Sequence, residues 1–128
     1  MPKTVYDTRF FLEHYYSRES ATLRKTKEAI QKTKERFISA IVLHEIYWLT
    51  LECEGQETAD LRASLLEKDF KVVKVDAEIA KSSAHLRQKY RTNIVDSIIA
   101  ATALRLEATC LSDDPHLRTM DEIKTVWI

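Results

Sequence analysis

Four carboxylates in this chain lie in or beside apolar sequence, and together they could bind a divalent metal ion. Glu45 lies inside the most apolar stretch, residues 37–51, while Asp7 follows a short apolar segment. Asp96 precedes a run of Ile and Ala, and Asp114 lies near the C-terminal end. Burying an ionised carboxylate is costly unless it is paired, protonated or bound to a metal. Oxygen ligands favour hard cations, so Mg²⁺ or Mn²⁺ is expected rather than zinc.

Each carboxylate also has a purely structural interpretation. Glu45 could form a buried ion pair with one of the many Lys or Arg residues. Asp7 and Asp114 could cap the helices that begin beside them, and Asp96, three residues after Asn93, is close to a capping box. A capping carboxylate keeps a lone pair free, so capping and metal binding are compatible. The caps leave Glu45 unexplained.

Other common chemistries are not supported by the sequence. The only glycine, Gly55, rules out a P-loop and a G-x-G-x-x-G fingerprint. No Ser or Cys has an evident His and acid arrangement for nucleophilic catalysis. The histidines do not have the spacing of zinc ligands, and we interpret all four as ordinary helix or loop residues: His14, His44, His85 and His116.

The composition predicts one soluble globular domain spanning residues 1–128. Of the 128 residues 45% are hydrophobic and 31% charged, and no stretch has the roughly 18 apolar residues needed to span a membrane. The 20 basic and 20 acidic residues balance, so no global positive field indicates a nucleic-acid binder. Basic residues are nevertheless frequent at 18–36, where a solvated helix face is at least as good an interpretation as contact with a nucleic-acid backbone. Arg87, Lys89 and Arg91 lie just before Asp96 and are the preferred candidates for guiding a nucleic-acid backbone toward the acids.

Hydrophobic periodicity predicts strands alternating with helices. The strands are expected at 4–6, 36–39, 70–75, 108–112 and 124–128, and the helices at 10–17, 20–35, 40–55, 57–68, 77–90 and 93–107, with a short turn from Pro115. In the helix at 57–68 we expect Leu61, Leu65 and Leu66 to face inward. Strands separated by helices imply an α/β domain with a parallel sheet covered on both faces.

This topology would bring the acidic residues together. Ligands of open parallel α/β sheets bind beyond the carboxyl ends of the strands. Asp7 and Asp114 follow the first and fourth strands, Glu45 lies within two turns after the second, and Asp96 opens the helix before the fourth. Four carboxylates at one edge would repel each other unless cations lie between them. Small residues on the face of Asp96, such as Ala100 and Ala103, would let its helix approach the sheet closely.

The order and spacing of these segments resemble the PIN domains of VapC toxins from bacterial and archaeal toxin–antitoxin pairs. The matching segments cover nearly the whole chain: Val5-Tyr6-Asp7-Thr8, Ser39-Ala40-Ile41-Val42-Leu43-His44-Glu45-Ile46, Asn93-Ile94-Val95-Asp96-Ser97-Ile98-Ile99-Ala100-Ala101-Thr102-Ala103 and Leu111-Ser112-Asp113-Asp114-Pro115-His116-Leu117. The resemblance implies a three-layer αβα fold whose central parallel sheet has four to five strands.

The resemblance also implies an activity and its residues. The family's metal-binding acids map onto Asp7, Glu45, Asp96 and Asp114, which would support metal-assisted hydrolysis of RNA phosphodiesters with Mg²⁺ or Mn²⁺. Asp7 and Asp96 would be the principal ligands, with Glu45 holding a second ion or a water. Thr8 and Ser112 correspond to hydroxyl residues that help to hold the pocket. Asp113 occupies a variable place in the last motif, so the sequence leaves open whether Asp113 or Asp114 faces the pocket.

Partners also follow from the resemblance, which implies an RNA substrate, a homodimer and a VapB-like antitoxin that inserts a C-terminal segment, often carrying an Arg, into the pocket. Tyr15, Tyr16 and Trp48 are candidate interface anchors, although for Trp48 core packing is the preferred interpretation. Two isolated cysteines, Cys53 and Cys110, favour a reducing cytoplasm over a disulfide-stabilised secreted protein.

Two alternatives compete with the nuclease interpretation. A PIN-like module could bind metal or RNA without cleaving it, but the full set of acids argues against that loss. A response-regulator receiver also combines an α/β fold with clustered acids. That class needs paired acids after the first strand and a lysine near the fifth, whereas this chain has the single Asp7 and the wrong strand spacing.

Overall fold

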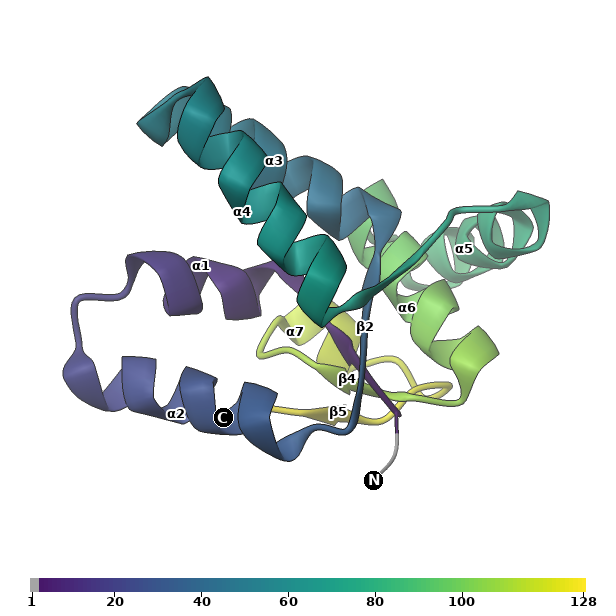
Figure 1. The fold of residues 1–128 in the computed structure, drawn as a ribbon. Coiled ribbons are helices and arrows are strands. Elements are labelled where there is room, and N and C mark those ends of the chain that lie inside the picture. Colours follow the sequence, from purple (N-terminus) through teal and green to yellow (C-terminus); the bar gives the residue numbers. More distant parts are fainter. Residues whose placement is uncertain (1–2) are drawn as a thin grey trace.

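The computed structural model describes residues 3–128 and contains one sheet in which all five strands are parallel (Figure 1). In chain order the strands are β1 (Lys3–Tyr6), β2 (Glu35–Ser39), β3 (Lys71–Val73), β4 (Thr109–Leu111) and β5 (Thr125–Val126). Their order across the sheet is β3-β2-β1-β4-β5, so the first strand lies at the centre. The expected α/β architecture with a central parallel sheet is confirmed.

The centre of the sheet is the most buried part of the protein. Val5 and Tyr6 of β1 and Cys110 of β4 are completely buried, because a parallel strand with helices on both faces must be apolar on both sides. Tyr6 contacts the rings of Phe10 and Phe70 edge to face, with ring centroids 4.9 and 5.0 Å apart. This packing holds the carboxyl end of β1, and therefore Asp7, in a rigid position.

Seven helices connect and cover the described strands. They are α1 (Thr8–Tyr16), α2 (Ser20–Lys32), α3 (Ala40–Glu54), α4 (Gln56–Asp69), α5 (Ala77–Tyr90), α6 (Ile94–Leu106) and α7 (Pro115–Arg118). Figure 1 shows α1 beside α2, α5 beside α6, and α3 and α4 as a hairpin that projects away from the sheet. None of the helices within residues 3–128 is long and apolar enough to cross a membrane.

The α3–α4 hairpin turns at Gly55, which the sequence predicts as a helix stop. The backbone there has φ 91°, a conformation that side chains other than glycine rarely adopt. A Cβ atom at Gly55 would have no neighbour within 4 Å, so it is the backbone conformation, and not a lack of space, that requires glycine.

Two expectations about packing are wrong. Leu61 and Leu65 of α4 are 63% and 49% exposed, and only Leu66 of the three leucines faces inward. Trp48 of α3 is 56% exposed and does not pack in the core. The physical reason is that α4 packs mainly on α3, and the described part of the chain leaves the outer faces of both helices uncovered.

The edge strands are also shorter than predicted. β3 covers residues 71–73 instead of 70–75, and β5 covers 125–126 instead of 124–128. Phe70 is buried among the aromatic rings of the core instead of continuing the ladder. A periodic apolar pattern does not report how far an edge strand stays paired with its single neighbour.

Candidate active site at the carboxyl edge of the sheet

All four candidate carboxylates line one pocket at the carboxyl edge of the sheet. The pocket has a volume of about 330 Å³ and is lined by Asp7, Glu45, Asp96 and Asp114 together with Thr8, Arg9, Leu12, Asn93 and Val95. These residues come from the segments that follow β1, β2 and β4 and from the first turn of α6. Because parallel strands end at the same edge, acids that are distant in sequence meet in space.

Asp7 is the most deeply buried of the four acids, with a relative exposure of 2%. Its Oδ2 accepts a hydrogen bond of 2.5 Å from the Ser112 hydroxyl, whose oxygen accepts one from the backbone N–H of Asp114 at 3.0 Å. Ser112 thereby ties the end of β1 to the end of β4. Asp7 makes no side-chain cap hydrogen bond to α1, so the capping interpretation does not account for it.

The pocket opposes the ionisation of Asp7 and Asp96. The pKa of Asp7 is raised to about 6, mainly by burial and also by the nearby charges of Asp96 and Asp114, against the opposing hydrogen bond from Ser112. The pKa of Asp96 is also raised, first by burial and then by the charge of Asp114. A bound divalent cation would remove this conflict, because it would stabilise the ionised form of each carboxylate.

Asp96 is positioned by Asn93, which is the residue that caps α6. The Asn93 Oδ1 accepts from the backbone N–H of Asp96 at 2.8 Å, and its Nδ2 donates to Asp96 Oδ2 at 3.0 Å. These contacts agree with the interpretation of Asn93 and Asp96 as a near capping box in the first turn of α6, and the Asp96 side chain also lines the pocket. Ala100 and Ala103 are completely buried, which agrees with the expected close approach of this helix.

Glu45 is held by a hydroxyl and not by a basic side chain. Its Oε1 accepts a hydrogen bond of 2.5 Å from Thr8, and no Lys or Arg within residues 3–128 forms a salt bridge with it. The alternative interpretation of Glu45 as part of a buried ion pair is therefore wrong for the described residues. Glu45 is partly exposed on the pocket side of α3, where a cation could reach it.

The structure decides between Asp113 and Asp114. Asp114 lines the pocket and caps α7 by accepting from the backbone N–H of His116 at 2.9 Å, as its capping interpretation predicts. Asp113 turns away and forms two hydrogen bonds with the guanidinium of Arg9, at 2.5 and 3.3 Å. The Arg9 guanidinium holds the pKa of the Asp113 carboxyl below its usual range.

Two residues at the pocket were not singled out from the sequence. Arg9 is a basic residue in the lining, and its place two residues after Asp7 was the available signal. His116 was interpreted as an ordinary helix or loop residue, but its Nδ1 lies 3.0 Å from Asp114 Oδ1 and 3.6 Å from Asp96 Oδ2. Asp96, Asp114 and His116 form a group that could hold a metal ion.

The predicted RNA-contacting residues lie outside this pocket. Arg87 and Arg91 line a separate hollow on α5, while Lys89 forms a salt bridge of 2.9 Å with Glu122. Tyr16 forms a hydrogen bond with Glu54, and Tyr15 is partly buried against the core.

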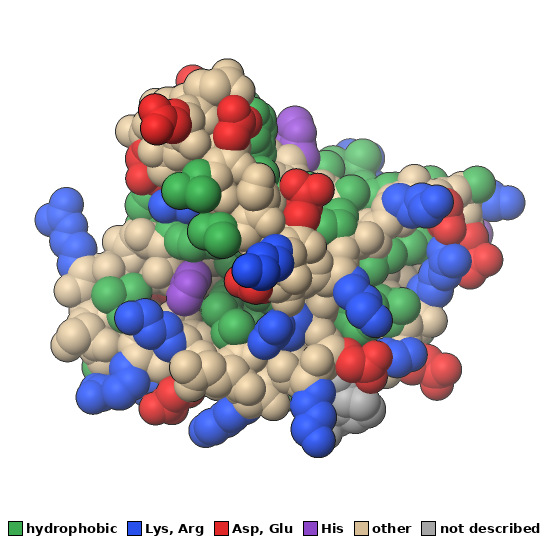
Figure 2. Space-filling view, viewed as in Figure 1, with side chains coloured by type: hydrophobic (Ala, Val, Ile, Leu, Met, Phe, Trp, Pro, Cys, Tyr) green, Lys and Arg blue, Asp and Glu red, His purple; other side chains and the backbone are tan. Residues whose placement is uncertain are grey.

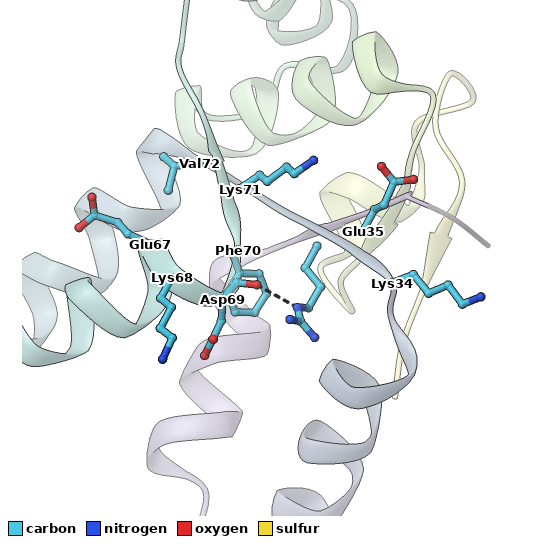
Figure 3. A pocket seen from close by; sticks show the side chains of 9 residues that line it. Lys34, Glu35, Glu67, Lys68, Asp69, Phe70, Lys71 and Val72 are labelled. Carbon is cyan, nitrogen blue, oxygen red and sulfur yellow. Dashed lines mark hydrogen bonds between the residues drawn. The ribbon is translucent and has the colours of Figure 1, made fainter.

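Two of the basic residues at 18–36, Lys34 and Arg36, lie at the amino end of β2. Lys and Arg side chains gather over the lower part of the face in Figure 2. Arg36, at the start of β2, donates to the backbone carbonyls of Ile30 and Asp69 and lines a hollow with Lys34 and Lys71 (Figure 3). This hollow also contains Glu35, Glu67 and Asp69, so its charge is mixed. Its position at the amino ends of the strands separates it from the acidic pocket.

Comparison with known proteins supplies a family. A family model described as "PIN domain" matches residues 4–123. The comparison with curated proteins found no match.

Several solved structures have a similar fold. VapBC-1 from nontypeable Haemophilus influenzae aligns with a TM-score of 0.81 at 14% identity, covering 96% of both chains. A toxin–antitoxin complex from Klebsiella pneumoniae gives 0.76 at 21% identity over 96% of this chain and 95% of that one. Mycobacterium tuberculosis VapC20, described as a sarcin-ricin loop cleaving toxin, gives 0.73 at 15% identity over 94% and 98%. At these identities the likeness shows a shared fold.

Proposed function

This chain belongs to the PIN domain family, and from that premise we propose that it is a divalent-metal-dependent endoribonuclease, the toxin of a VapBC-type pair. The observation that carries the proposal is the meeting of Asp7, Glu45, Asp96 and Asp114 around one pocket. In this function residues 1–128 would form a single catalytic domain that acts in the cytoplasm. The alternative, an inactive RNA-binding module, would not need four acids around one pocket, two of which, Asp7 and Asp96, are buried there with raised pKa values.

The donor set in the pocket fits a hard divalent ion. Asp7 and Asp96 would be the principal ligands of Mg²⁺ or Mn²⁺, with Glu45 and Asp114 completing the oxygen ligands. A bound ion would activate water for attack on the phosphodiester and stabilise charge on the leaving oxygen. Thr8 and Ser112 hold Glu45 and Asp7 in place through their hydroxyl groups.

Removal of the metal is expected to abolish RNA cleavage. Purified protein should cut a labelled single-stranded RNA when Mg²⁺ or Mn²⁺ is present, and excess EDTA should stop the reaction. Without a cation, the negatively charged carboxylates have nothing with which to neutralise the charge of the phosphate. Adding back excess Mn²⁺ should restore it. Cleavage that continues in EDTA would contradict metal dependence, and RNA binding without cleavage at any metal concentration would favour the inactive module.

Arg9 is the best-placed residue to contact the RNA backbone beside the metal. Its guanidinium lies at the pocket mouth with half of its side-chain surface exposed, and Asp113 orients it through two hydrogen bonds. A planar guanidinium can bind phosphate with two parallel hydrogen bonds. Arg87 and Arg91 remain proposed contacts for more distant phosphates, since they line a different hollow.

Replacing Arg9 by Ala is expected to weaken RNA binding more than it slows the chemical step. The KM should rise about tenfold with little change in kcat. The slope of log KM against log salt concentration should fall by about 1, the value expected for the loss of one phosphate contact. Steady-state cleavage of the labelled RNA at several salt concentrations measures both quantities. The matched control is Arg24→Ala, an exposed arginine on α2. A loss of kcat at unchanged KM would contradict this role.

An apolar hollow beside the acidic pocket supports the antitoxin part of the proposal. It has a volume of about 370 Å³, includes Ile41, Trp48 and Leu49, and shares Thr8, Leu12, Glu45 and Val95 with the acidic pocket. An apolar segment that carries an Arg could fill this hollow and neutralise the acids together. The exposed Leu61 and Leu65 offer further apolar surface for an antitoxin or for a second copy in a homodimer.

A further inference from the structure

The side chain of His116 faces two carboxylates that come from different parts of the chain. Its Nδ1 lies 3.0 Å from Oδ1 of Asp114, the N-cap of α7, and 3.6 Å from Oδ2 of Asp96 in α6. A single ligand atom from each of the three residues fits within a span of 4.8 Å. Capping of α7 needs only Asp114 and the backbone N–H of His116, so it does not explain the approach of the ring to Asp96.

We propose that His116 is a nitrogen ligand of the divalent ion, which it binds together with Asp96 and Asp114. The inference rests on the proposed function and names a ligand that the set of four carboxylates does not include. It makes one side of the pocket a mixed nitrogen and oxygen site. Imidazole suits transition metals better than Mg²⁺, so the site would bind Mn²⁺ in preference to Mg²⁺.

The separations are those of neighbouring ligands of one ion. Two ligand atoms at about 2.1 Å from a metal and at right angles lie about 3 Å apart. The separation of His116 Nδ1 from Asp114 Oδ1, which are hydrogen-bonded in the metal-free protein, already has that value, and the separation from Asp96 Oδ2 exceeds it by less than 1 Å. The His116 side chain is 61% exposed, so it can move toward the carboxylates without disturbing the core.

A competing explanation predicts the opposite effect on metal affinity. A positively charged His116 could act as a counter-ion that holds Asp96 and Asp114 together and is displaced when the metal binds. In that case removing the ring would remove a competitor, and the metal would bind more tightly. A ligand and a competitor are therefore distinguished by the direction of the change.

The experiment measures Mn²⁺ binding by titration calorimetry and the surroundings of the bound Mn²⁺ by pulsed electron paramagnetic resonance. The wild-type protein should show ¹⁴N coupling from a directly bound imidazole. His116→Ala should lose that coupling, and its Kd for Mn²⁺ should rise at least about tenfold while the Kd for Mg²⁺ changes less. The substitution keeps the backbone N–H that Asp114 accepts, so α7 retains its cap. His85→Ala, at an exposed position on α5, is the matched control and should behave as the wild type.

The other outcomes would refute either the ligand role of His116 or the proposed nuclease function. Mn²⁺ binding without ¹⁴N coupling, or tighter binding by His116→Ala, would refute the ligand role and leave the metal-dependent nuclease intact. Coupling that persists in His116→Ala would assign the nitrogen to another residue and would also refute it. Absence of Mn²⁺ binding by the wild type, or binding unaffected by Asp96→Asn, would refute the proposed function itself.

Discussion

Asp96→Asn is expected to lower the rate of RNA cleavage by about a thousandfold or more while the protein stays folded. The substitution removes a negative charge from the metal site but keeps the size of the side chain. The amide oxygen can still accept the hydrogen bond that Asn93 Nδ2 donates to Asp96 Oδ2. Because burial and the charge of Asp114 already raise the pKa of Asp96, a neutral side chain suits this position.

The measurement is kcat at saturating Mn²⁺, together with a thermal melt of the same preparation. Asp121→Asn is the matched control, since it removes an equivalent charge from an exposed carboxylate outside the pocket lining. It should cleave RNA at the wild-type rate. Cleavage by folded Asp96→Asn at more than about a tenth of the wild-type rate would contradict the assignment of Asp96 as a principal ligand.

Asp7→Asn is expected to stabilise the metal-free protein at neutral pH although it destroys the metal site. The folded-state pKa of Asp7 is about 6, above the value of 3.8 for the unfolded chain. Between these pH values the folded protein therefore binds more protons than the unfolded chain does. The contribution of this carboxyl group to the free energy of unfolding is complete below about pH 4 and is lost as the pH rises through 6. A difference of about two pKa units corresponds to about 3 kcal/mol, so the variant should gain up to that amount at pH 7.

Urea denaturation in EDTA at a series of pH values measures this effect. The free energy of unfolding of the wild type should fall relative to that of Asp7→Asn between about pH 4 and pH 6. Adding Mn²⁺ should raise the wild-type value and leave the variant nearly unchanged, because only the wild type keeps the complete site. A variant less stable than the wild type at pH 7 without metal would contradict the destabilising role of Asp7.

The two predictions describe one conflict between folding and function. Folding brings four carboxylates to one pocket, where burial and the charges of neighbouring acids oppose the ionisation of Asp7 and Asp96. Hydroxyl groups of Thr8 and Ser112 and the amide of Asn93 orient three of the acids without neutralising them. The remaining negative charge is what would attract a divalent ion, and binding of the ion would return stability to the fold.

The sequence by itself determined the alternation of strands and helices and the acids that follow the strands. These features are local: apolar periodicity marks each element, and the carboxyl ends of parallel strands meet at one edge whatever the details of packing. For this reason Asp7, Glu45, Asp96 and Asp114 could be predicted to meet. The match of the family model over residues 4–123 agrees with the motif spacing that suggested the fold.

Only the tertiary structure decided which side chains complete the pocket and which surfaces stay uncovered. Asp113 is hydrogen-bonded to Arg9, a residue 104 positions earlier in the chain, and does not line the pocket. His116 in α7 approaches Asp96 in α6. Leu61 remains exposed because the described part of the chain provides nothing to cover it. Each of these outcomes depends on distances between segments that are far apart in sequence, and local propensity carries no information about such distances.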